Sequence, residues 1–340
     1  MKLYEIAHSR TGDKGNISTI SLIPYMDGFY DQLVKEVTEE KVLEQFRHIG
    51  ATKVERYLIP SLHSMNFVIH DTLGGGVTRS LALDTHGKSL SSLLLEMEIK
   101  MPCFCTVKDP GVENQLSLKI REQKSPDNRW KDTVCCIARA YNPAVRNHDV
   151  IFYGASNFSL WESMEEDLKP YSVQNHAFGG STDKELLMWA ESMLYPYEPC
   201  FVFFQTGSND YVESKAPTEA EKVAEAMAFK KEMFIELHKK LPGTSFIVMS
   251  GILLPGREEY TAMTLNINEQ LKAFCETKAY MHYIDAEALT YDRNTGKFTD
   301  HVKDLFLDDQ IHLTPEARRI WAEKWILPAM DKLVTPTPMR

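Results

Sequence analysis

Four short motifs in the second half of the chain carry residue types that together could perform acyl transfer. Ser156 belongs to the motif Tyr153–Asn157, which directly follows the apolar run Val150–Phe152, and later motifs supply Gly180 and Asn209. The last motif is an Asp-x-x-His pair formed by residues 309 and 312. Acyl transfer from an ester needs a nucleophile, a base beside it, a group that orients the base and donors for the oxyanion. The four motifs contain all of these parts, each after its own apolar run.

Each part has a candidate role. Ser156 is the candidate nucleophile, because the two small residues before it permit a sharp turn from a strand into a helix. His312 is the candidate base, and Asp309 can orient it because residues three apart share one face of a helical turn. The candidate oxyanion-hole donors are the backbone N–H groups of Ser156 and Gly180 and the side-chain amide of Asn209. Removal of one such donor typically costs about 2.7–4 kcal/mol of transition-state stabilisation.

Each motif also has a purely structural interpretation. The Gly-Gly-Ser-Thr stretch could be a helix entry with Ser181 or Thr182 as the N-cap. The residue types of Gly207–Asp210 are common in turns, and a lone Gly-x-Ser sequence usually forms a turn. The Asp-x-x-His pair precedes a helix start with Thr314 as the cap and Pro315 at the first position. Four independent turns would have no reason to carry this complement, so the catalytic interpretation is favoured.

The elements that must position these residues alternate between strand-like and helix-like stretches. We expect strands at Asp149–Tyr153, Ser172–His176, Cys200–Gln205, Ser245–Ser250 and Met281–Asp285. Amphipathic helical stretches are expected at 158–169, 183–195, 217–241, 260–278 and 315–334. This alternation predicts an α/β fold, a three-layer α/β/α sandwich around a five-stranded parallel sheet. Ligand sites in such sheets lie outside the carboxyl ends of the strands, where three of the motifs fall.

Residues 147–336 resemble the SGNH hydrolase (GDSL-type esterase) family. The resemblance places Ser156 on the family's nucleophile, Gly180 and Asn209 on its oxyanion positions, and Asp309 and His312 on its last block. Two residues depart from the usual pattern. Ala155 stands where the family commonly has Asp, and Gln310 stands where Gly is common between the Asp and the His. The neighbouring Asp308 leaves open which carboxylate faces the imidazole, although the spacing favours Asp309.

Composition sets broad limits on the function. At 340 residues the chain is long enough for two domains, and its formal net charge is −10. The acidic excess lies in the catalytic half and there is no basic stripe, so we expect no nucleic-acid partner. No apolar run approaches the length of a membrane span, so we expect no membrane partner. The N-terminal sequence has the pattern of a strand rather than of a signal peptide, so we expect a cytoplasmic location.

Six cysteines are scattered along the chain, at positions 103, 105, 135, 136, 200 and 275. Their spacing lacks the C-x-x-C pairs of zinc sites and no histidine is placed to complete a ligand set, so we expect no metal. Reduced thiols fit a reducing compartment. We expect no cofactor for the proposed chemistry.

Residues 1–100 predict a compact α+β domain. Strands are expected at Leu3–Ala7, Ile17–Ile23 and Lys53–Ile59, around a polar turn at Arg10–Asn16. Helices are expected over Tyr30–Val37 and over Glu39–His48 with Thr38 as N-cap, and the run 62–73 could be either strand or helix. The Gly-Asp-Lys-Gly and Gly-Gly-Gly elements resemble the ferredoxin-like domain of the acyclic terpene utilisation (AtuA) proteins. That resemblance implies a setting in acyl-CoA and terpenoid catabolism but no assigned reaction.

The two glycine loops of this domain have two interpretations. Arg10, Lys14 and Arg79, with backbone N–H groups, could bind an anion such as phosphate. The alternative, which we favour, is that the glycines supply left-handed turn conformations and the charges are solvated. Neither loop matches a Walker or dinucleotide fingerprint.

The segment 101–146 joins the two domains. Several Pro, Gly and Asn residues punctuate it, and short strand-like runs at Leu116–Ile120 and Thr133–Ala138 predict an ordered connector rather than a flexible tether. We therefore expect an AtuA-like domain over 1–100, the connector over 101–146, and the SGNH hydrolase domain over 147–340.

The functional expectation is a serine carboxylic ester hydrolase for a small-molecule substrate. Short-chain acyl esters, including acetyl esters of carbohydrates, are the default substrates. An acyl-CoA thioester is the alternative within the enzyme class. A scaffold or binding protein with a secondary hydrolase half is the alternative from another class. As a partner, a second copy of the chain could bind through the N-terminal domain to form a homo-oligomer.

Overall fold

A computed structural model of the chain describes residues 2–25, 29–99, 107, 111–123, 129–145 and 149–334. The chain forms two compact units, Met1–Pro102 with Lys124–Asp132, and Cys103–Gln123 with Thr133–Arg340. None of the helices in the described ranges combines the length and the apolar character needed to cross a bilayer. Each unit has its own sheet and its own hydrophobic core.

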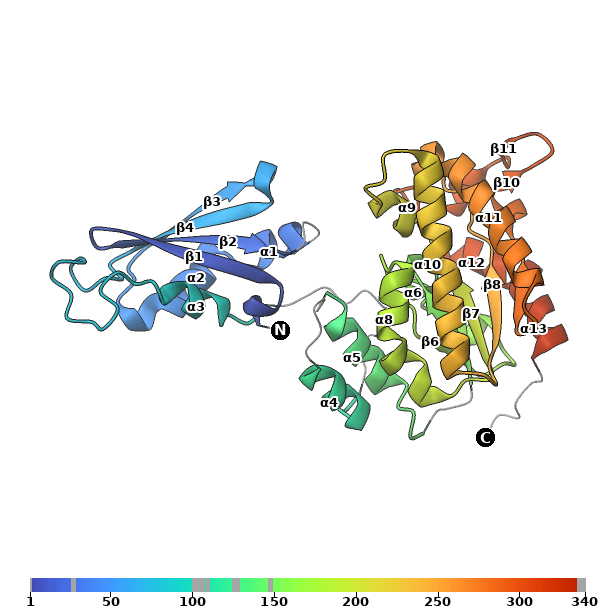
Figure 1. The fold of residues 1–340 in the computed structure, drawn as a ribbon, viewed down its shortest axis with the longest axis horizontal. Coiled ribbons are helices and arrows are strands. Elements are labelled where there is room, and N and C mark those ends of the chain that lie inside the picture. Colours follow the sequence, from blue (N-terminus) through green and yellow to red (C-terminus); the bar gives the residue numbers. More distant parts are fainter. Residues whose placement is uncertain are drawn as a thin grey trace. The chain divides into compact units, whose positions relative to one another are not determined.

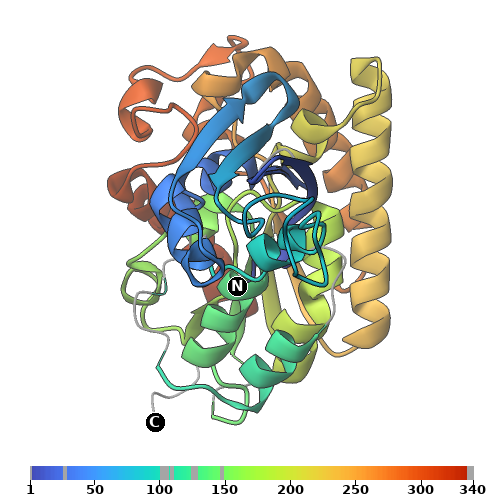
Figure 2. The same cartoon turned by 90° about the vertical axis from the view of Figure 1, so that its left-hand side faces the viewer.

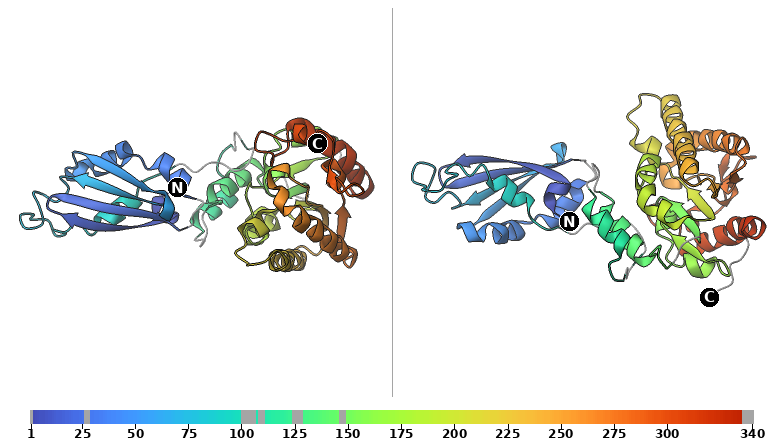
Figure 3. Two further views of the ribbon diagram at one scale, coloured as in Figure 1. Left: turned by 90° about the horizontal axis from the view of Figure 1, so that it is seen from above. Right: turned by 60° about the horizontal axis from the view of Figure 1, so that its bottom comes forward.

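The N-terminal unit is an antiparallel sheet with helices on one face, as predicted. Its strands are β1 (Ala7–Lys14), β2 (Ile17–Pro24), β3 (Val54–Ile59) and β4 (Ser64–His70), in the order β1-β2-β4-β3. Its helices are α1 (Tyr30–Glu36), α2 (Glu39–Phe46) and α3 (Leu90–Leu95). Residues of β2 alternate between buried and partly exposed, and the buried ones, such as Ile20 and Leu22, share one core with Phe46 and Leu94 of the helices. Figure 3 shows α2 and α3 against the same face of this sheet.

Two details of this unit differ from the sequence prediction. Leu3–Glu5 is a short 3-10 helix, and β1 runs through most of the segment predicted to be a polar turn. The antiparallel ladder pairs Arg10 with Ser21 and Lys14 with Ile17. Backbone groups form such a ladder whatever the side chains are, so a polar segment can be a strand where one face meets water. The tight turn is confined to Gly15 and Asn16.

The second unit contains the predicted parallel sheet. Its strands are β5 (Val150–Gly154), β6 (Val173–Asn175), β7 (Phe201–Gln205), β8 (Ser245–Met249) and β9 (Met281–Ile284). The order is β6-β5-β7-β8-β9, and all neighbouring strands run parallel. Four of the five strands lie within the predicted runs and β5 extends one residue beyond its run, so the predicted fold class is confirmed.

Helices cover both faces of this sheet. On one face lie α8 (Asp183–Met193), α10 (Glu219–Lys240) and α11 (Thr261–Glu276), side by side in Figure 1. On the other face lie the short helices α6 (Ser156–Ser159) and α7 (Met164–Asp167), with α12 (Pro315–Trp321) and α13 (Leu327–Leu333). Figure 2 shows α10 in gold and the C-terminal helices in red on opposite sides of the sheet.

Successive aromatic residues of the central strands pack on opposite faces of the sheet. Phe152 of β5 stacks on Phe203 of β7 with ring centroids 4.7 Å apart and meets Phe158 of α6 at 5.1 Å. Phe204, the next residue of β7, meets Phe234 of α10 at 5.0 Å on the other face. This alternation is the two-residue period of a strand, used here with apolar residues on both faces because both are covered.

Three predictions in this unit were wrong in detail. The strand-like runs at 116–120 and 133–138 are parts of two helices, α4 (Gln115–Glu122) and α5 (Lys131–Ala140). A short apolar run has no period that separates strand from helix, and here Asn114 caps α4 and donates to Ala138 O of α5 at 2.7 Å. The stretch 158–169 is divided between α6 and α7, and the short helix α9 (Asn209–Glu213) was not predicted.

Candidate active site

Ser156 lies at the first position of α6, immediately after the sharp turn that ends β5. A Cβ atom on Gly154 would lie 2.2 Å from the carbonyl oxygen of Gln205 on β7, so only glycine fits this turn. The next residue, Ala155, donates its N–H to the same oxygen at 3.2 Å. The turn that carries Ser156 is therefore bound to the end of the neighbouring strand.

The loop after β6 is hydrogen bonded to the same turn. The carbonyl oxygen of Gly154 accepts the Phe178 N–H at 3.1 Å and the Ser181 hydroxyl at 3.2 Å. Between these two, Gly180 adopts a φ of 79°, in the left-handed region that favours glycine. Thr182 follows as the N-cap of α8, and both its N–H and its hydroxyl donate to Glu185. The helix-entry interpretation of this motif is thus correct, and it is compatible with an oxyanion role for Gly180.

The amide of Asn209 is held at both ends. Its Nδ2 donates to Ser181 O at 3.0 Å, and its Oδ1 accepts from Nη1 of Arg257 at 3.4 Å. The same Nη1 also donates to the Ser208 hydroxyl. Because an amide nitrogen carries two hydrogens, one N–H of Asn209 stays available for another acceptor. Fixed orientation with one free donor is what an oxyanion hole requires.

Two backbone donors complete this group. Within the described part of the chain, neither the N–H of Ser156 nor that of Gly180 donates to a protein acceptor. Ser156 begins α6 after β5 and Gly180 lies on the loop after β6, both at the carboxyl end of the sheet. Their shared use for an oxyanion stays a prediction, and the geometry leaves them free for it.

Asp309 and His312 meet directly. Asp309 Oδ2 lies 2.6 Å from Nδ1 of the imidazole, and its Oδ1 accepts the backbone N–H groups of Ile311 at 2.9 Å and His312 at 3.0 Å. The pair is Asp309 with His312, so the ambiguity left by Asp308 is resolved in this structure. The two residues occupy a turn closed by a bridge between Phe306 and Leu313 rather than the helical turn we predicted.

This turn explains one departure from the family pattern. Gln310 adopts a φ of 56°, in the left-handed region where glycine costs least. Gln310 fits there because its side-chain amide donates to Leu307 O at 3.0 Å and its backbone N–H donates to the same oxygen at 2.8 Å.

The charge of Asp309 is strongly stabilised. Partial burial opposes ionisation, but the N–H groups of His312 and Ile311 and the imidazole itself lower the pKa of Asp309 to about 2. The carboxylate is therefore ionised at neutral pH. It accepts a proton-bearing Nδ1, which leaves Nε2 of His312 as the basic nitrogen.

A hydrogen bond connects the His312 turn to the nucleophile turn. The N–H of Leu313 donates to Oδ1 of Asn157 at 3.5 Å, so the residues that follow His312 and Ser156 are in contact. A second contact comes from the loop after β8, where Gly256 donates its N–H to Gln310 O at 2.8 Å. The last block, about 150 residues beyond Ser156 in the sequence, is thereby brought to the same edge of the sheet.

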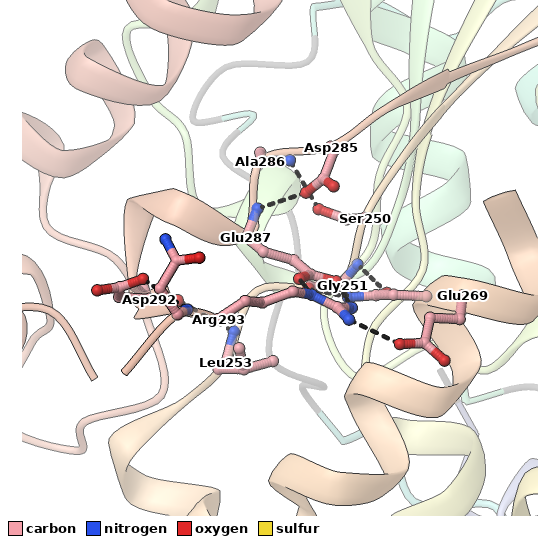
Figure 4. A network of polar contacts seen from close by, with 12 residues as sticks. Ser250, Gly251, Leu253, Glu269, Asp285, Ala286, Glu287, Asp292 and Arg293 are labelled. Carbon is pink, nitrogen blue, oxygen red and sulfur yellow. Dashed lines mark hydrogen bonds and ion pairs between the residues drawn. The ribbon is translucent and has the colours of Figure 1, made fainter. Parts of the chain in front are cut away.

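The loop after β8 is itself held by the polar network in Figure 4. Asn268 of α11 accepts from Gly251 N and donates to Gly251 O, each at 2.8 Å, and also donates to Glu287 at 2.8 Å. Arg293 pairs with Glu287 and with Glu269. The network fixes the start of the loop that delivers Arg257 to Asn209.

Sequence reasoning missed Asn157, Arg257 and Asn268. Asn157 was visible as part of the first motif, next to the candidate nucleophile, and no role was assigned to it. Arg257 had no sequence signal beyond its place after an apolar strand. Its contact with Asn209 depends on how two loops meet, and a single sequence does not show that.

The candidate anion-binding residues of the N-terminal unit are all exposed. Arg10 and Lys14 lie on β1, and Arg79 lies beyond the Gly-Gly-Gly loop. The side chain of Asn16 accepts the backbone N–H groups of Leu73 at 3.1 Å and Gly75 at 3.0 Å, so these two donors are already used. Anion binding by this domain stays a prediction.

The cysteines give no sign of a shared site. Cys103 and Cys105 lie outside the described residues. Cys200 and Cys275 are free thiols, and Cys135 Sγ lies 3.7 Å from Ser117 O. Among the described residues there is no group of three or more metal-ligating side chains.

The fold and the site thus define a parallel α/β unit with a Ser, Gly, Asn, Asp and His set at its carboxyl edge, preceded by a ferredoxin-like unit. Residues 1–100 match the family model of the AtuA ferredoxin-like domain, which confirms the resemblance for this part of the chain. A search of curated proteins found no match to the chain.

Several solved structures are similar to part of this chain. A GDSL-like lipase from Bacteroides thetaiotaomicron is 18% identical, with a TM-score of 0.45 over 57% of this chain and 95% of that one. The acetylxylan esterase Axe2 from Geobacillus stearothermophilus is 15% identical, with a TM-score of 0.42 over 56% of this chain and 96% of that one. A lipase/acylhydrolase from Enterococcus faecalis is 13% identical, with a TM-score of 0.43 over 57% and 100%. These values are too low to assign an activity to this chain.

Proposed function

We propose that the second unit is a serine carboxylic ester hydrolase that acts through an acyl-enzyme. The observation that carries the proposal is the turn of Asp309 and His312. In this turn Asp309 Oδ2 lies 2.6 Å from Nδ1 of His312, and the N–H of Leu313 donates to Oδ1 of Asn157, the residue after Ser156. A base oriented by a carboxylate, on a turn that is hydrogen bonded to the residue after a partly exposed serine, supports activation of that hydroxyl.

The proposed reaction has two halves. Ser156 Oγ attacks the acyl carbonyl carbon while its proton moves to Nε2 of His312, and Asp309 stabilises the imidazolium that forms. The oxyanion is held by the free N–H of Asn209 and the backbone N–H groups of Ser156 and Gly180. The C–O bond to the alcohol then breaks, and His312 returns the proton to the leaving alcohol.

In the second half, water attacks the acyl-enzyme and gives its proton to His312. The tetrahedral intermediate collapses with return of that proton to Ser156 Oγ, and the free acid leaves. The oxyanion donors recognise only the carbonyl oxygen, so they set no limit on the acyl chain. We propose short-chain acyl esters as the substrates.

Hydrolysis of p-nitrophenyl acetate and butyrate by the wild type and by Ser156→Ala tests this function. We expect the variant to lose several orders of magnitude in kcat, by analogy with about 10⁶ for removal of a triad serine in subtilisin. The matched control is Ser91→Ala, which removes a hydroxyl of the N-terminal unit that donates only to Lys88 O, and its activity should equal that of the wild type.

A second measurement separates a selective enzyme from an inactive one. A fluorophosphonate probe should label Ser156 in the wild type, and mass spectrometry should find no labelled peptide in Ser156→Ala. If the wild type shows neither hydrolysis nor labelling, the scaffold interpretation replaces the hydrolase.

A further inference from the structure

Lys230 is a buried cation that the proposed reaction does not use. It lies on α10, and its side chain is 2% exposed, while that of its partner Asp183 is fully buried. Its Nζ lies 2.8 Å from Asp183 Oδ2 and 2.5 Å from Thr206 Oγ1. A buried lysine is costly unless it is paired and hydrogen bonded, so its surroundings show what it supports.

Those surroundings are the two loops that carry oxyanion donors. Asp183 is the first residue of α8, three positions after Gly180, and Thr206 follows β7, three positions before Asn209. Asp183 also donates its backbone N–H to Asp210 Oδ1 at 2.9 Å. Lys230 therefore connects both loops to the middle of α10.

The cluster contains two carboxylates and one ammonium group. Oδ1 of Asp183 and Oδ2 of Asp210 are both buried, and neither has a hydrogen-bond partner among the described residues. With both carboxylates ionised the cluster would hold one uncompensated negative charge next to Asn209. With one proton on Asp210 it is neutral.

The charged neighbours of Asp210 are few. Asp183 comes from α8, Lys230 from α10, and Arg257 from the 3-10 helix Pro255–Tyr260 that contacts Ser208 and Asn209. Tyr211, on the same helix as Asp210, is neutral and bonded to Thr264 of α11 at 2.6 Å. Burial, and after it the charge of Asp183, raises the pKa of Asp210 to about 7.

Lys230 stays protonated in this setting. Burial opposes its charge, but the two aspartates outweigh burial and raise its pKa.

We propose that Asp183 and Asp210 share one proton beside the protonated Lys230, and that the three act as positioning residues that hold the Gly180 and Asn209 loops for oxyanion binding. This inference depends on the proposed function for its link to catalysis. Loss of the shared proton to solvent places a second negative charge beside the oxyanion hole, where it opposes the charge that develops in the transition state.

The first test uses Asp210→Asn, which is isosteric and can still accept the Asp183 N–H. Deprotonation of the catalytic base raises kcat with pH in both proteins, so the readout is the ratio of the wild-type kcat to that of Asp210→Asn, measured with p-nitrophenyl acetate. This ratio should fall several-fold as the pH rises through about 7, whereas the KM should change little. A ratio that does not change with pH would overturn the proposal.

The second test does not depend on activity. Asp210 is protonated in the folded protein up to about pH 7 but releases its proton near pH 4 when unfolded. Folding thus takes up a proton between these values, and the free energy of unfolding of the wild type should fall as the pH rises from about 4 to about 7. Asp210→Asn should not show this fall. Equal pH dependence of the free energy of unfolding in the two proteins would refute the proposal of a shared proton, even if the wild type is an active esterase.

Substitution of the lysine tests its positioning role. Lys230→Met alone leaves two buried carboxyl groups without a cation, so the variant Lys230→Met with Asp183→Asn is the better one to measure. We expect it to fold and to show a kcat at least ten-fold below that of the wild type, with little change in KM.

Lys239→Met is the matched control, because Lys239 is an exposed lysine of the same helix that pairs with Glu236. Its kcat should be unchanged. A double variant with full kcat would refute the positioning role. A wild type without esterase activity would refute the link to catalysis, and the pH dependence of unfolding would then report on the shared proton alone.

Discussion

Substitution of Gly154 by alanine should disturb both the stability of the second unit and the placement of Ser156. The added Cβ would lie 2.2 Å from Gln205 O, 2.9 Å from Gln205 C and 3.2 Å from Gln205 N. All three are backbone atoms of β7, so no side chain can rotate away. An ordinary contact starts at 3.4 Å, which means that the two strands must separate by more than 1 Å at this point.

The magnitude follows from what that separation breaks. Gly154 is paired with Gln205 in the sheet, and the Ala155 N–H donates to Gln205 O at 3.2 Å. Overpacking of this kind typically costs about 1–3 kcal/mol, to which loss of a backbone hydrogen bond adds about 0.5–1.5 kcal/mol. We therefore expect Gly154→Ala to be destabilised by about 1.5–4.5 kcal/mol. A misplacement of about 1 Å at a reacting group can cost about 10²-fold in rate, so kcat/KM should fall by about that factor.

Urea unfolding followed by tryptophan fluorescence measures the first effect. Trp161, Trp189 and Trp321 are buried in the second unit, and Trp325 is partly buried against its core. Gly243→Ala is the matched control, because Gly243 ends the turn before β8 with no atom within 4 Å of an added Cβ. If Gly154→Ala unfolds at the same urea concentration as Gly243→Ala and keeps full activity, the close approach of β5 and β7 is not a constraint and the reasoning fails.

Three further predictions concern the site and its supports. Asp309→Asn should lower kcat by about 10²–10⁴-fold through loss of imidazole orientation. Because the folded-state pKa of Asp309 is lowered to about 2, the wild type should also lose stability as the pH falls from about 4 to about 2. Thermal melts of the variant should not show that loss. Asn209→Ala should lower kcat for p-nitrophenyl acetate by about 10²–10³-fold with little change in KM, and an unchanged kcat would exclude its amide from the oxyanion hole. Thr314→Ala removes the N-cap hydrogen bond that the Ala317 N–H donates to Thr314 Oγ1 (3.2 Å) and should lower the free energy of unfolding in urea by about 1 kcal/mol. Thr277→Ala, which removes a hydroxyl beyond the end of α11, should cost less.

The sequence by itself determined the parallel sheet and the membership of the candidate site. Both depend on local signals: apolar runs of strand length, helical periodicity between them, and short motifs that follow strand ends. The Thr314 cap and the left-handed glycines were equally local, and the structure confirms them. The same signals failed at Leu116–Ile120 and Thr133–Ala138, because a five-residue apolar run does not distinguish a strand from a helix that buries one face.

The sequence also contained a signal for the buried residue Lys230, which was not predicted. The apolar face of α10 runs through Val223, Met227, Phe234 and Leu237, and Lys230 occupies the position between them. A lysine on the buried face of a helix signals a buried partner, since an unpaired charge there would be too costly. The identity of that partner was not readable, because Asp183 belongs to a different helix.

Only the tertiary structure decided how the motifs cooperate. The Ser181 contact of Asn209, the Arg257 contact that orients it and the Leu313 contact with Asn157 each join loops from different parts of the chain. Such contacts depend on strand order and on the path of each loop. Many distant residues each contribute a small part of the free energy that fixes this order and these paths. Residue type and spacing specify the chemistry that each group can perform, whereas the packing of the whole unit fixes the distances at which the groups act.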